Sequence, residues 1–392
     1  MMRWKEELKR SIRDVEELRR PLFLTDAEVS DMQRVSETFP LQITPYYLGL
    51  IDSIDPDDPI RNLIVPGPGE LDETGSLDTS GEALSTRIRG LQHKYSSTAL
   101  LLVSGKCACY CRFCFRKRLF EDLEDTGETI EDYKATFQYL EEHTEISNVL
   151  VSGGEPLLLS NEKLDWILTR IGKIPHIRSI RIGTKIPAFL PFRITEDKEL
   201  QAILSKHSQS RRRLYVITHF DHPRELTDEA VASLDSLTRA GVFLCNQTVL
   251  LRRINSRRGV LRQLLSELGN VGATPYYVFQ CRPVKGSRHS QVPLERGYRL
   301  LEEAKRGLSG LGKRFKYIMS HYTGKIEICG VANTDRGKRI YLKYHQARYP
   351  EDLGRFFALP LVAGARWLDD LIPAEWSASR AFPRNPSAVG YK

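Results

Sequence analysis

Long apolar runs are missing from this sequence of 392 residues. A membrane-spanning helix needs roughly 20 consecutive apolar residues, and no stretch comes near that length. The N-terminus is charged from Arg3 onward and lacks the apolar segment of a secretory signal. We therefore expect a soluble, cytoplasmic protein that does not associate with a membrane.

Internal repeats, low-complexity tracts and a concentrated basic patch are also missing. The net charge is +8, but the basic residues are scattered, and the densest groups are residues 211–213 and 252–258. Scattered charge of this kind usually solvates a surface. The composition therefore favours an ordinary globular protein and argues against nucleic acid as its partner.

Short apolar runs alternate with amphipathic segments after residue 98. The expected strands are residues 98–103, 148–152, 179–184, 214–219, 242–250 and 274–280. The expected helices are residues 130–143, 162–173, 227–241 and 257–270. This alternation predicts an α/β fold with a mostly parallel sheet, either doubly wound or a partial barrel. In both architectures chemistry is expected at the carboxyl ends of the strands.

The segments that flank this core have other patterns. Residues 3–35 show helical periodicity, and Thr25 and Glu28 have the spacing of a capping box. Residues 54–85 are rich in Pro, Gly, Asp, Ser and Thr and predict a long irregular connection with little core. Residues 331–392 hold strand-like stretches before a polar tail that we expect to be loosely ordered. We divide the chain into an N-terminal helical region and connection (1–95), a core (96–300) and a C-terminal region (301–392).

Four of the 7 cysteines lie close together in the stretch CACYCRFC (107–114). Cys107, Cys111 and Cys114 follow the first expected strand, and three thiolates on one loop can hold three irons of a [4Fe–4S] cluster, which leaves the fourth iron open. A structural zinc site normally needs a fourth thiolate or imidazole, commonly in paired CxxC units, and the sequence has none. A zinc site that recruits Cys109, or a set of buried inert thiols, remains an alternative.

These features resemble the radical S-adenosylmethionine (SAM) enzymes, whose motif is CxxxCxxC with an aromatic residue before the last cysteine, here Phe113. The flanks are similar to the lysine 2,3-aminomutase family. The matching stretches are ITPYYLGLID (43–52), CRFCFRKRLF (111–120), VLVSGGEPLLL (149–159), RIGTKIPAFLPFRIT (181–195), THFDHPRELT (218–227), AGVFLCNQTVLLRRIN (240–255) and PYYVFQCRPVKGSRHSQVPLERG (275–297). The resemblance covers roughly residues 1–330. It implies a partial (β/α)6 barrel of the radical SAM type, with an N-terminal helical region and a C-terminal extension.

The resemblance also implies where SAM binds. In the family the motif at Gly153, Gly154 and Glu155 holds the SAM amino group. Glycines let a backbone approach a ligand, and a carboxylate can accept hydrogen bonds from an ammonium group. Phe113 is expected on the adenine side of SAM, with His219 and Gln247 among the other contacts. A plain strand-to-helix turn and a structural histidine are the alternatives.

The family carries pyridoxal 5′-phosphate (PLP) as a Schiff base on a lysine. The best counterpart here is Lys325, although the family's glycine-rich stretch is reduced to Gly324, and Lys313 is a rival. Lys94 and Tyr95 stand where the family has an Arg-Tyr pair directed to the PLP phosphate. A lysine binds phosphate as a point charge, without the fork of a guanidinium.

The substrate residues depart from the lysine-specific enzymes. Arg116 matches the family arginine that grips the substrate α-carboxylate. The two aspartates that hold the lysine ammonium correspond here to Arg282 and Ser320. Because a cation repels a cationic side chain, we expect an acidic or neutral side chain, glutamate first. Alternatively, Arg282 turns outward to solvent or to an acidic neighbour. No cysteine follows Cys329, so the zinc site between subunits of lysine enzymes is expected to be absent.

The resemblance thus implies a radical SAM, PLP-dependent 2,3-aminomutase, an isomerase that moves the α-amino group of a free amino acid to its β-carbon. The reduced cluster would cleave SAM to a 5′-deoxyadenosyl radical. A flavodoxin or ferredoxin is the expected electron donor. We expect the cluster to be oxygen-labile, so that the protein needs anaerobic handling. A homo-oligomer is a further expectation.

Three other functions stay open. A PLP-independent radical SAM enzyme, such as a dehydrogenase or mutase of an anionic small molecule, is favoured by the thin glycine loop. A non-catalytic iron–sulfur or zinc protein would bind nucleic acid through its positive charge. An enzyme that modifies a lysine of a translation factor would need an open, acidic pocket, and Arg282 argues against it.

Overall fold

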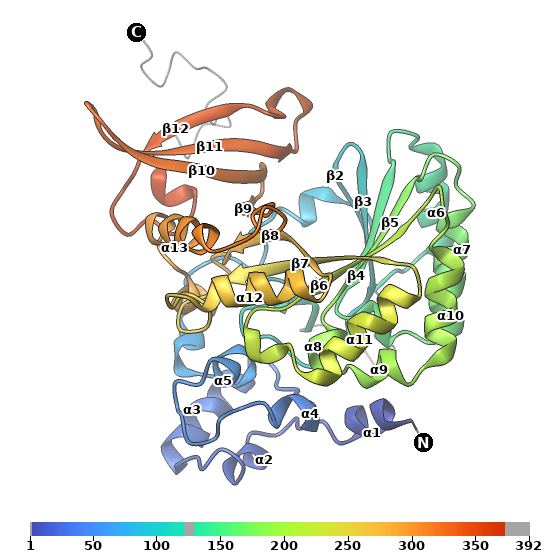
Figure 1. Cartoon of the computed structure of the whole chain (residues 1–392), viewed down its shortest axis with the longest axis horizontal. Helices are drawn as coiled ribbons and strands as arrows, with labels where there is room; N and C mark the ends of the chain where they lie inside the picture. The colour runs from blue at the N-terminus through green and yellow to red at the C-terminus, as the bar shows by residue number, and fades with distance from the viewer. Residues whose placement is uncertain (1, 121–128, 373–392) are drawn as a thin grey trace.

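A sheet of 12 strands forms the centre of the computed structural model, which describes residues 2–120 and 129–372. Neighbouring strands follow chain order from one edge to the other (Figure 1). The strands are β1 (Thr86–Ile88), β2 (Leu91–Tyr95), β3 (Thr98–Ser104), β4 (Asn148–Gly153), β5 (Ser179–Thr184), β6 (Leu214–His219), β7 (Phe243–Leu250), β8 (Thr274–Gln280), β9 (Lys316–His321), β10 (Gly324–Thr334), β11 (Gly337–Ala347) and β12 (Phe356–Pro360).

The strands from β3 to β9 are parallel, and those at both edges of the sheet are antiparallel. The six expected strands are β3 to β8, and each end is within one residue of the expectation. A doubly wound sheet reverses its strand order at a switch point, and this sheet does not. The α/β class is therefore confirmed, with the sequential strand order of a partial barrel.

Helices connect the parallel strands along the outer side of the sheet (Figure 1). The crossover helices are α6 (Tyr133–Glu142), α7 (Asn161–Gly172), α10 (Lys198–His207), α11 (Asp228–Arg239), α12 (Val260–Asn270) and α13 (Leu294–Arg306), and two short helices, α8 (Ile186–Phe189) and α9 (Phe192–Thr195), follow β5. The sequence shows why they form: Leu261, Leu264 and Leu268 put α12 on the core at steps of three and four, and the Thr227 hydroxyl caps α11. The four expected helices are α6, α7, α11 and α12.

The N-terminal region consists of short helices below the sheet in Figure 1. They are α1 (Arg3–Lys9), α2 (Glu16–Arg19), α3 (Asp26–Ser36), α4 (Pro45–Leu48) and α5 (Pro59–Ile64). The capping box is confirmed at α3, where the Thr25 amide donates to the Glu28 carboxylate at 2.9 Å and the Glu28 amide donates to the Thr25 hydroxyl at 3.3 Å. The expectation of little core in residues 54–85 is wrong, because Ile60, Leu63 and Ile64 of α5 are fully buried.

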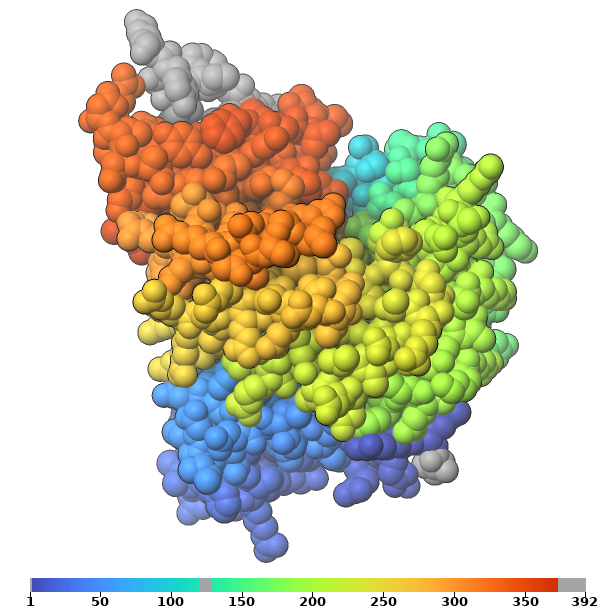
Figure 2. Space-filling model, in the orientation of Figure 1, coloured from blue at the N-terminus to red at the C-terminus, as the bar shows by residue number. Residues whose placement is uncertain are grey.

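The C-terminal strands extend the same sheet and build a second core. This core joins β7 to β12 through residues such as Leu250, Met319 and Leu342. The strand-like stretch after residue 331 is β11, and the polar tail lies outside the described residues. The division at residues 95 and 300 stays a prediction, and the sheet itself continues across both positions. The N-terminal and C-terminal parts lie at opposite ends of the molecule in Figure 2.

No described helix has the length and apolar character needed to cross a membrane.

Candidate active site

A cavity of about 300 Å³ opens on the inner face of the parallel strands. Its walls contain every residue for which the sequence predicts a role: Lys94, Tyr95, Cys107, Cys111, Phe113, Cys114, Arg116, Gly153, Gly154, Glu155, His219, Gln247, Arg282, Ser320 and Lys325. The rival Lys313 is exposed and does not line this cavity. The individual roles stay predictions, but one cavity brings their residues together.

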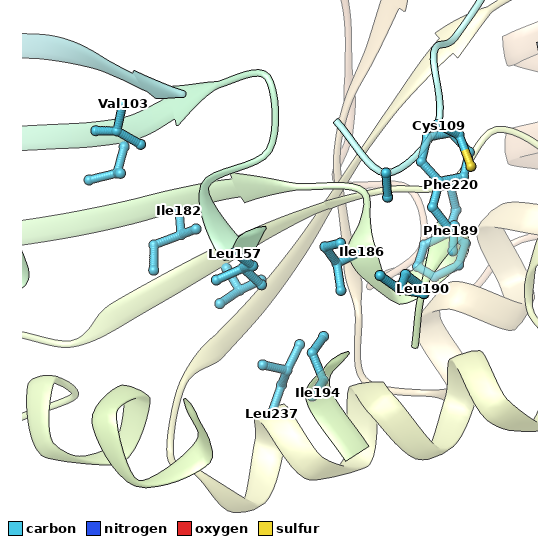
Figure 3. Packing of buried hydrophobic residues seen from close by; sticks show 14 of the residues in the cluster. Val103, Cys109, Leu157, Ile182, Ile186, Phe189, Leu190, Ile194, Phe220 and Leu237 are labelled. Carbon is cyan, nitrogen blue, oxygen red and sulfur yellow. The ribbon is translucent and has the colours of Figure 1, made fainter. Parts of the chain in front are cut away.

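The four clustered cysteines have two different environments. All four border the cavity, but only Cys107, Cys111 and Cys114 are partly exposed. Cys109 is 1% exposed, and its Sγ accepts a hydrogen bond from the Thr44 amide at 3.4 Å. Figure 3 shows Cys109 beside the rings of Phe189 and Phe220. The structure thus separates Cys109 from the other three thiols.

The three partly exposed thiols are arranged so that each can bind a separate iron of a cluster. Burial, together with neighbouring thiolates, raises the pKa of Cys107, so its ionised form needs a cationic partner. Among residues 2–120 and 129–372, no three His, Cys, Asp or Glu side chains are arranged to hold one metal ion. A [4Fe–4S] cluster takes one thiolate on each iron, so its ligands need not converge on a point.

Buried ion pairs anchor the cysteine loop. The Nε of Arg112 donates to Glu70 Oε1 at 2.8 Å, and Lys117 Nζ donates to Glu70 Oε2 at 3.0 Å. Arg112 also donates to the Pro40 carbonyl at 2.8 Å. Burial opposes ionisation of Glu70, but the two cations outweigh it and hold the pKa of Glu70 below its usual value. Glu70 therefore ties the loop to the N-terminal region.

Gly153 and Gly154 are required by close packing at the end of β4. The Gly154 amide donates to the Ser104 carbonyl at 2.5 Å. A Cβ on Gly153 would lie 2.4 Å from the Ser104 oxygen, and one on Gly154 would lie 2.4 Å from the Lys106 oxygen. Gly153 also has a φ of +127°, which favours glycine. The chain that leads into the cysteine loop accounts for both glycines, without any appeal to a ligand.

Glu155 is a buried carboxylate with several internal donors. It accepts from the Thr184 hydroxyl at 2.7 Å, from the Lys185 amide at 2.9 Å and from the Leu157 amide at 3.1 Å. Burial raises the pKa of Glu155 to about 7, against the effect of these hydrogen bonds. A role toward the SAM amino group must therefore use the remaining lone pairs of Glu155 or the carbonyl oxygens of the same turn.

A buried network fixes His219 in the cavity wall. His219 Nε2 lies 3.1 Å from Asp221 Oδ1, and Lys185 Nζ donates to Asp221 at 2.8 Å and pairs with Glu225 at 2.9 Å. The Tyr47 hydroxyl donates to Glu225 at 2.7 Å, which links the network to the N-terminal region. Burial opposes ionisation, but His219 and Lys185 outweigh it and lower the pKa of Asp221. The contact with Asp221 thus fixes the orientation of the His219 imidazole.

Arg116 lies against a buried carboxylate that the sequence did not reveal. Its Nη1 donates to the Ser152 hydroxyl at 3.2 Å, and its Nε lies 3.4 Å from Glu82 Oε1. Arg118 also pairs with Glu82. Burial opposes the ionisation of Glu82, but the arginines outweigh burial and hold the pKa of Glu82 at about 2. Glu82 is therefore a fixed negative charge in the cavity wall.

Arg282 faces the cavity. Its guanidinium lies 3.7 Å from the centre of the Phe115 ring and donates to the Ser80 hydroxyl. Burial lowers the pKa of Arg282 to about 10, which leaves it charged at neutral pH, and Glu82 opposes this shift. Arg282 therefore does not turn outward to solvent. The other part of that alternative, an acidic neighbour, is met by Glu82 inside the cavity.

Lys325 lies on β10 opposite Ser320 of β9. Its Nζ is 4.8 Å from the centre of the Tyr277 ring and 5.9 Å from that of Tyr95, and it makes no hydrogen bond within the described part of the chain. Burial, with help from Arg181 and Arg282, lowers the pKa of Lys325 to about 7. A large share of this amine is therefore neutral and nucleophilic at neutral pH.

Lys94 has carbonyl partners already. Its Nζ donates to the His321 carbonyl at 2.7 Å and to the Ser80 carbonyl at 3.0 Å. Burial lowers the pKa of Lys94 to about 7, and burial also raises the pKa of Tyr95. Lys94 thus joins the edge of the sheet at β2 to the end of β9.

Sequence reasoning missed several residues of the cavity wall: Glu82, Arg181, Lys185, Tyr277 and Gln346. Arg181 and Lys185 fall within the matching stretch RIGTKIPAFLPFRIT, which was the available signal. Glu82 lies in the connection before β1, and no local pattern marks it.

Comparisons with known proteins place the chain in a family. No family model matches it. It is 42% identical over 359 residues to an Aquifex aeolicus protein provisionally named L-lysine 2,3-aminomutase, across 91% of this chain and 94% of that one. It is 36% identical over 309 residues to the L-lysine 2,3-aminomutase of Acetoanaerobium sticklandii, across 78% of this chain and 73% of that one. The chain belongs to the lysine 2,3-aminomutase family.

Another relative in this family is the glutamate 2,3-aminomutase of Clostridioides difficile, 36% identical over 309 residues, across 79% of this chain and 72% of that protein. Among solved structures, a radical SAM methyltransferase from Sphaerobacter thermophilus reaches a TM-score of 0.41 at 16% identity, over 58% of this chain and 68% of that one, which is too low to carry an argument.

Membership makes the chain a radical SAM enzyme and an isomerase, with a [4Fe–4S] cluster and SAM as family cofactors. The alternative of a non-catalytic nucleic-acid-binding protein is set aside. The residues present fit the cluster, because Cys107, Cys111 and Cys114 line one cavity, and desolvation there raises the pKa of each thiol, so that the thiolate form needs a cationic partner.

Proposed function

We propose that this family member is a PLP-dependent 2,3-aminomutase of a free amino acid with an acidic or neutral side chain, and that glutamate is the first candidate. The position of Arg282 carries the proposal. Its guanidinium lines the same cavity as that of Arg116, so two arginines can each take one carboxylate. A dicarboxylic amino acid supplies both.

The charge of the cavity supports this choice of substrate. The lining arginines are Arg116, Arg181 and Arg282. The lining lysines are Lys94 and Lys325, each with a pKa of about 7, and Lys185, which is paired with Asp221 and Glu225. The lining carboxylates are Glu82 and Glu155, and Glu82 is already paired with Arg116 and Arg118. A side-chain ammonium group would meet a surplus of positive charge, whereas a carboxylate would be attracted. A relative that is named glutamate 2,3-aminomutase supports the choice of glutamate as the first candidate substrate.

The chain's own residues bind and orient in this proposal. Cys107, Cys111 and Cys114 would hold the cluster. Phe113, Gly153, Gly154, Glu155, His219 and Gln247 would surround SAM. When bound, the cluster and SAM supply the 5′-deoxyadenosyl radical and PLP supplies a ring that delocalises an unpaired electron. The neutral amine of Lys325 fits an aldehyde-bearing cofactor, with Lys94 and Tyr95 toward its phosphate. The cavity must also exclude water and oxygen.

The test is an anaerobic assay of the reconstituted protein with SAM, dithionite and a panel of glutamate, neutral amino acids and lysine. We expect a β-amino product from glutamate. Arg282→Gln should lower kcat/KM for glutamate at least about tenfold, because a hydrogen bond to a charged group contributes about 1.5–3 kcal/mol, and should change it little for a neutral amino acid. The control Arg252→Gln alters an exposed arginine and should have no effect. A preference for lysine would overturn the proposal.

A second candidate is a PLP-independent radical SAM enzyme of an anionic small molecule. Lys94 favours it, because carbonyls already occupy its amine and leave less of it for a phosphate. Borohydride reduction followed by mass analysis separates the candidates, since PLP bound by the protein is trapped on Lys325 and an enzyme without PLP shows no such adduct. The electron donor, a flavodoxin or ferredoxin, and homo-oligomerisation remain predictions.

A further inference from the structure

Gln346 is a polar side chain in the cavity wall that lacks a partner among the described residues. Its Oε1 is shielded from solvent and receives no hydrogen bond. Buried polar atoms are nearly always paired, and an unpaired acceptor costs stability. A protein keeps such a polar group most readily where a ligand supplies the missing hydrogen-bond partner.

The local backbone directs this side chain to the cavity. Gln346 of β11 lies opposite Lys325 of β10, and the next pair is Ile326 with Tyr344, so His345 is an extra residue in a bulge. His345 contacts the hydroxyl of the cavity residue Tyr277 at 2.8 Å. A regular strand would point His345 and Gln346 to opposite faces, and the bulge lets Gln346 line the cavity while His345 contacts Tyr277 of its wall.

The two sides of Lys325 differ. Toward β9, Lys94 reaches the His321 carbonyl at 2.7 Å. Toward β11, the neighbour of Lys325 is Gln346. In PLP the aldehyde carbon lies between two ring substituents, the phosphate-bearing arm and the 3-hydroxyl group. If the phosphate is directed to Lys94, the hydroxyl is directed to the β11 side.

We propose that Gln346 is a cofactor-contacting residue whose carboxamide NH2 donates a hydrogen bond to the 3-oxygen of PLP held on Lys325. The inference rests on the proposed function, because it needs PLP on that lysine. The 3-oxygen of PLP joined to a lysine is deprotonated and accepts hydrogen bonds, and half a turn of the Gln346 carboxamide brings its Nε2 amide to the position now held by the unpaired Oε1. The contact also gives the bulge in β11 a purpose. It also predicts a combination that a structural residue does not show: loss of Gln346 harms cofactor binding and spares the fold.

The test compares the full-length wild type, Gln346→Leu and the surface control Gln138→Leu. We expect the PLP-free Gln346→Leu variant to melt at the wild-type temperature or above it, because an apolar side chain leaves no unpaired acceptor. Its Kd for PLP, from absorbance titration, should rise about tenfold or more, as loss of one hydrogen bond of this kind predicts. The pH titration of the bound chromophore should shift, and borohydride should still label Lys325. Gln138→Leu should match the wild type.

Wild-type PLP affinity and spectrum in Gln346→Leu would overturn the inference alone and leave the proposed function in place. So would a lower melting temperature of the PLP-free variant, which would show a structural role. A raised KM for the amino acid with unchanged PLP binding would assign the amide to the substrate instead. A wild type that takes up no PLP would defeat the proposed cofactor and this inference together. Gln346→Met repeats the test if the leucine variant does not fold.

Discussion

Cys109 and Cys111 are two residues apart and have different neighbours. Both border the cavity, but only Cys111 is partly exposed, and burial raises the pKa of its thiol, with Lys185 acting against that shift. Cys109 packs among buried apolar side chains and accepts from the Thr44 amide. The first thiol is placed to bind a ligand, and the second is placed to fill space.

Replacement of each cysteine tests this division. Cys111→Ala should abolish the iron bound after anaerobic reconstitution, because it removes a cluster ligand. Cys109→Ala should keep the wild-type iron content and lose roughly 1 kcal/mol of stability with its buried contact. Iron and sulfide analysis and thermal melting measure both effects. Equal iron loss in the two variants would contradict the assignment.

Lys325 should react in a pH range where surface lysines do not. Its pKa of about 7 follows from burial and from Arg181 and Arg282. PLP labelling trapped by borohydride should therefore rise through pH about 7 at Lys325, whereas surface lysines need a pH near their usual value of about 10.4. The site-specific label is measured by peptide mass analysis. A midpoint above pH 9 at Lys325 would contradict the role of burial.

The lowered pKa of Lys325 also determines how the free energy of unfolding changes with pH. Between pH 7 and pH 10 the unfolded state binds more protons than the folded state at Lys325, so this residue makes stability rise with pH in that window. Below pH 7 Lys325 is charged in both the folded and the unfolded state, so the full cost of burying its charge lowers the stability. Lys325→Met should therefore raise the melting temperature most at neutral and lower pH, and a uniform effect at all pH values would count against it.

At the scale of elements, the cysteine loop depends on Glu70. Glu70→Ala leaves the buried cations Arg112 and Lys117 without their partner, and breaking a buried pair costs about 3–5 kcal/mol. We expect lower stability in urea and lower iron content together. The matched control is Glu73→Ala, whose side chain is 82% exposed and should change stability by less than about 0.5 kcal/mol. Normal iron content in Glu70→Ala would show that the loop is held in another way.

The strands of the core could be predicted because each is a short apolar run between turn residues. The β9 to β12 strands were harder, since the pairing of Lys325 with Ser320 and Gln346 depends on contacts distant in sequence. The helix α5 was missed because Pro and Gly around it hid the apolar spacing of Ile60, Leu63 and Ile64. Composition describes a segment as a whole, and burial is decided residue by residue.

The candidate site was predictable where motifs mark it and not where distant segments meet. The cysteines, Gly153 and Arg116 stand in recognisable stretches, and all of them line the cavity. Glu82 acquires its role only when the fold brings it to Arg116, and Gln346 only when a bulge turns it inward. Charge pairing across the sheet leaves no periodicity in the sequence.

At the scale of the whole molecule, residues 80–85 connect β2 with the ends of β9 and β11. Arg348, just beyond β11, donates to the Gly81 carbonyl at 3.1 Å and to the Ser85 hydroxyl at 2.9 Å. Lys94 joins the Ser80 carbonyl to His321 at the end of β9. Ser80, Glu82 and Ser85 of this connection line the cavity, so these contacts fix part of its wall.

The most direct test of the central claim is to follow the nitrogen atom itself. Glutamate labelled with ¹⁵N at the α-amino group is incubated anaerobically with the reconstituted protein, SAM and dithionite, and the product is analysed by NMR. The account predicts that ¹⁵N becomes bonded to the β-carbon, and that equally labelled lysine reacts far more slowly. If 5′-deoxyadenosine forms while ¹⁵N stays on the α-carbon of glutamate and of every neutral amino acid tested, the aminomutase account is wrong.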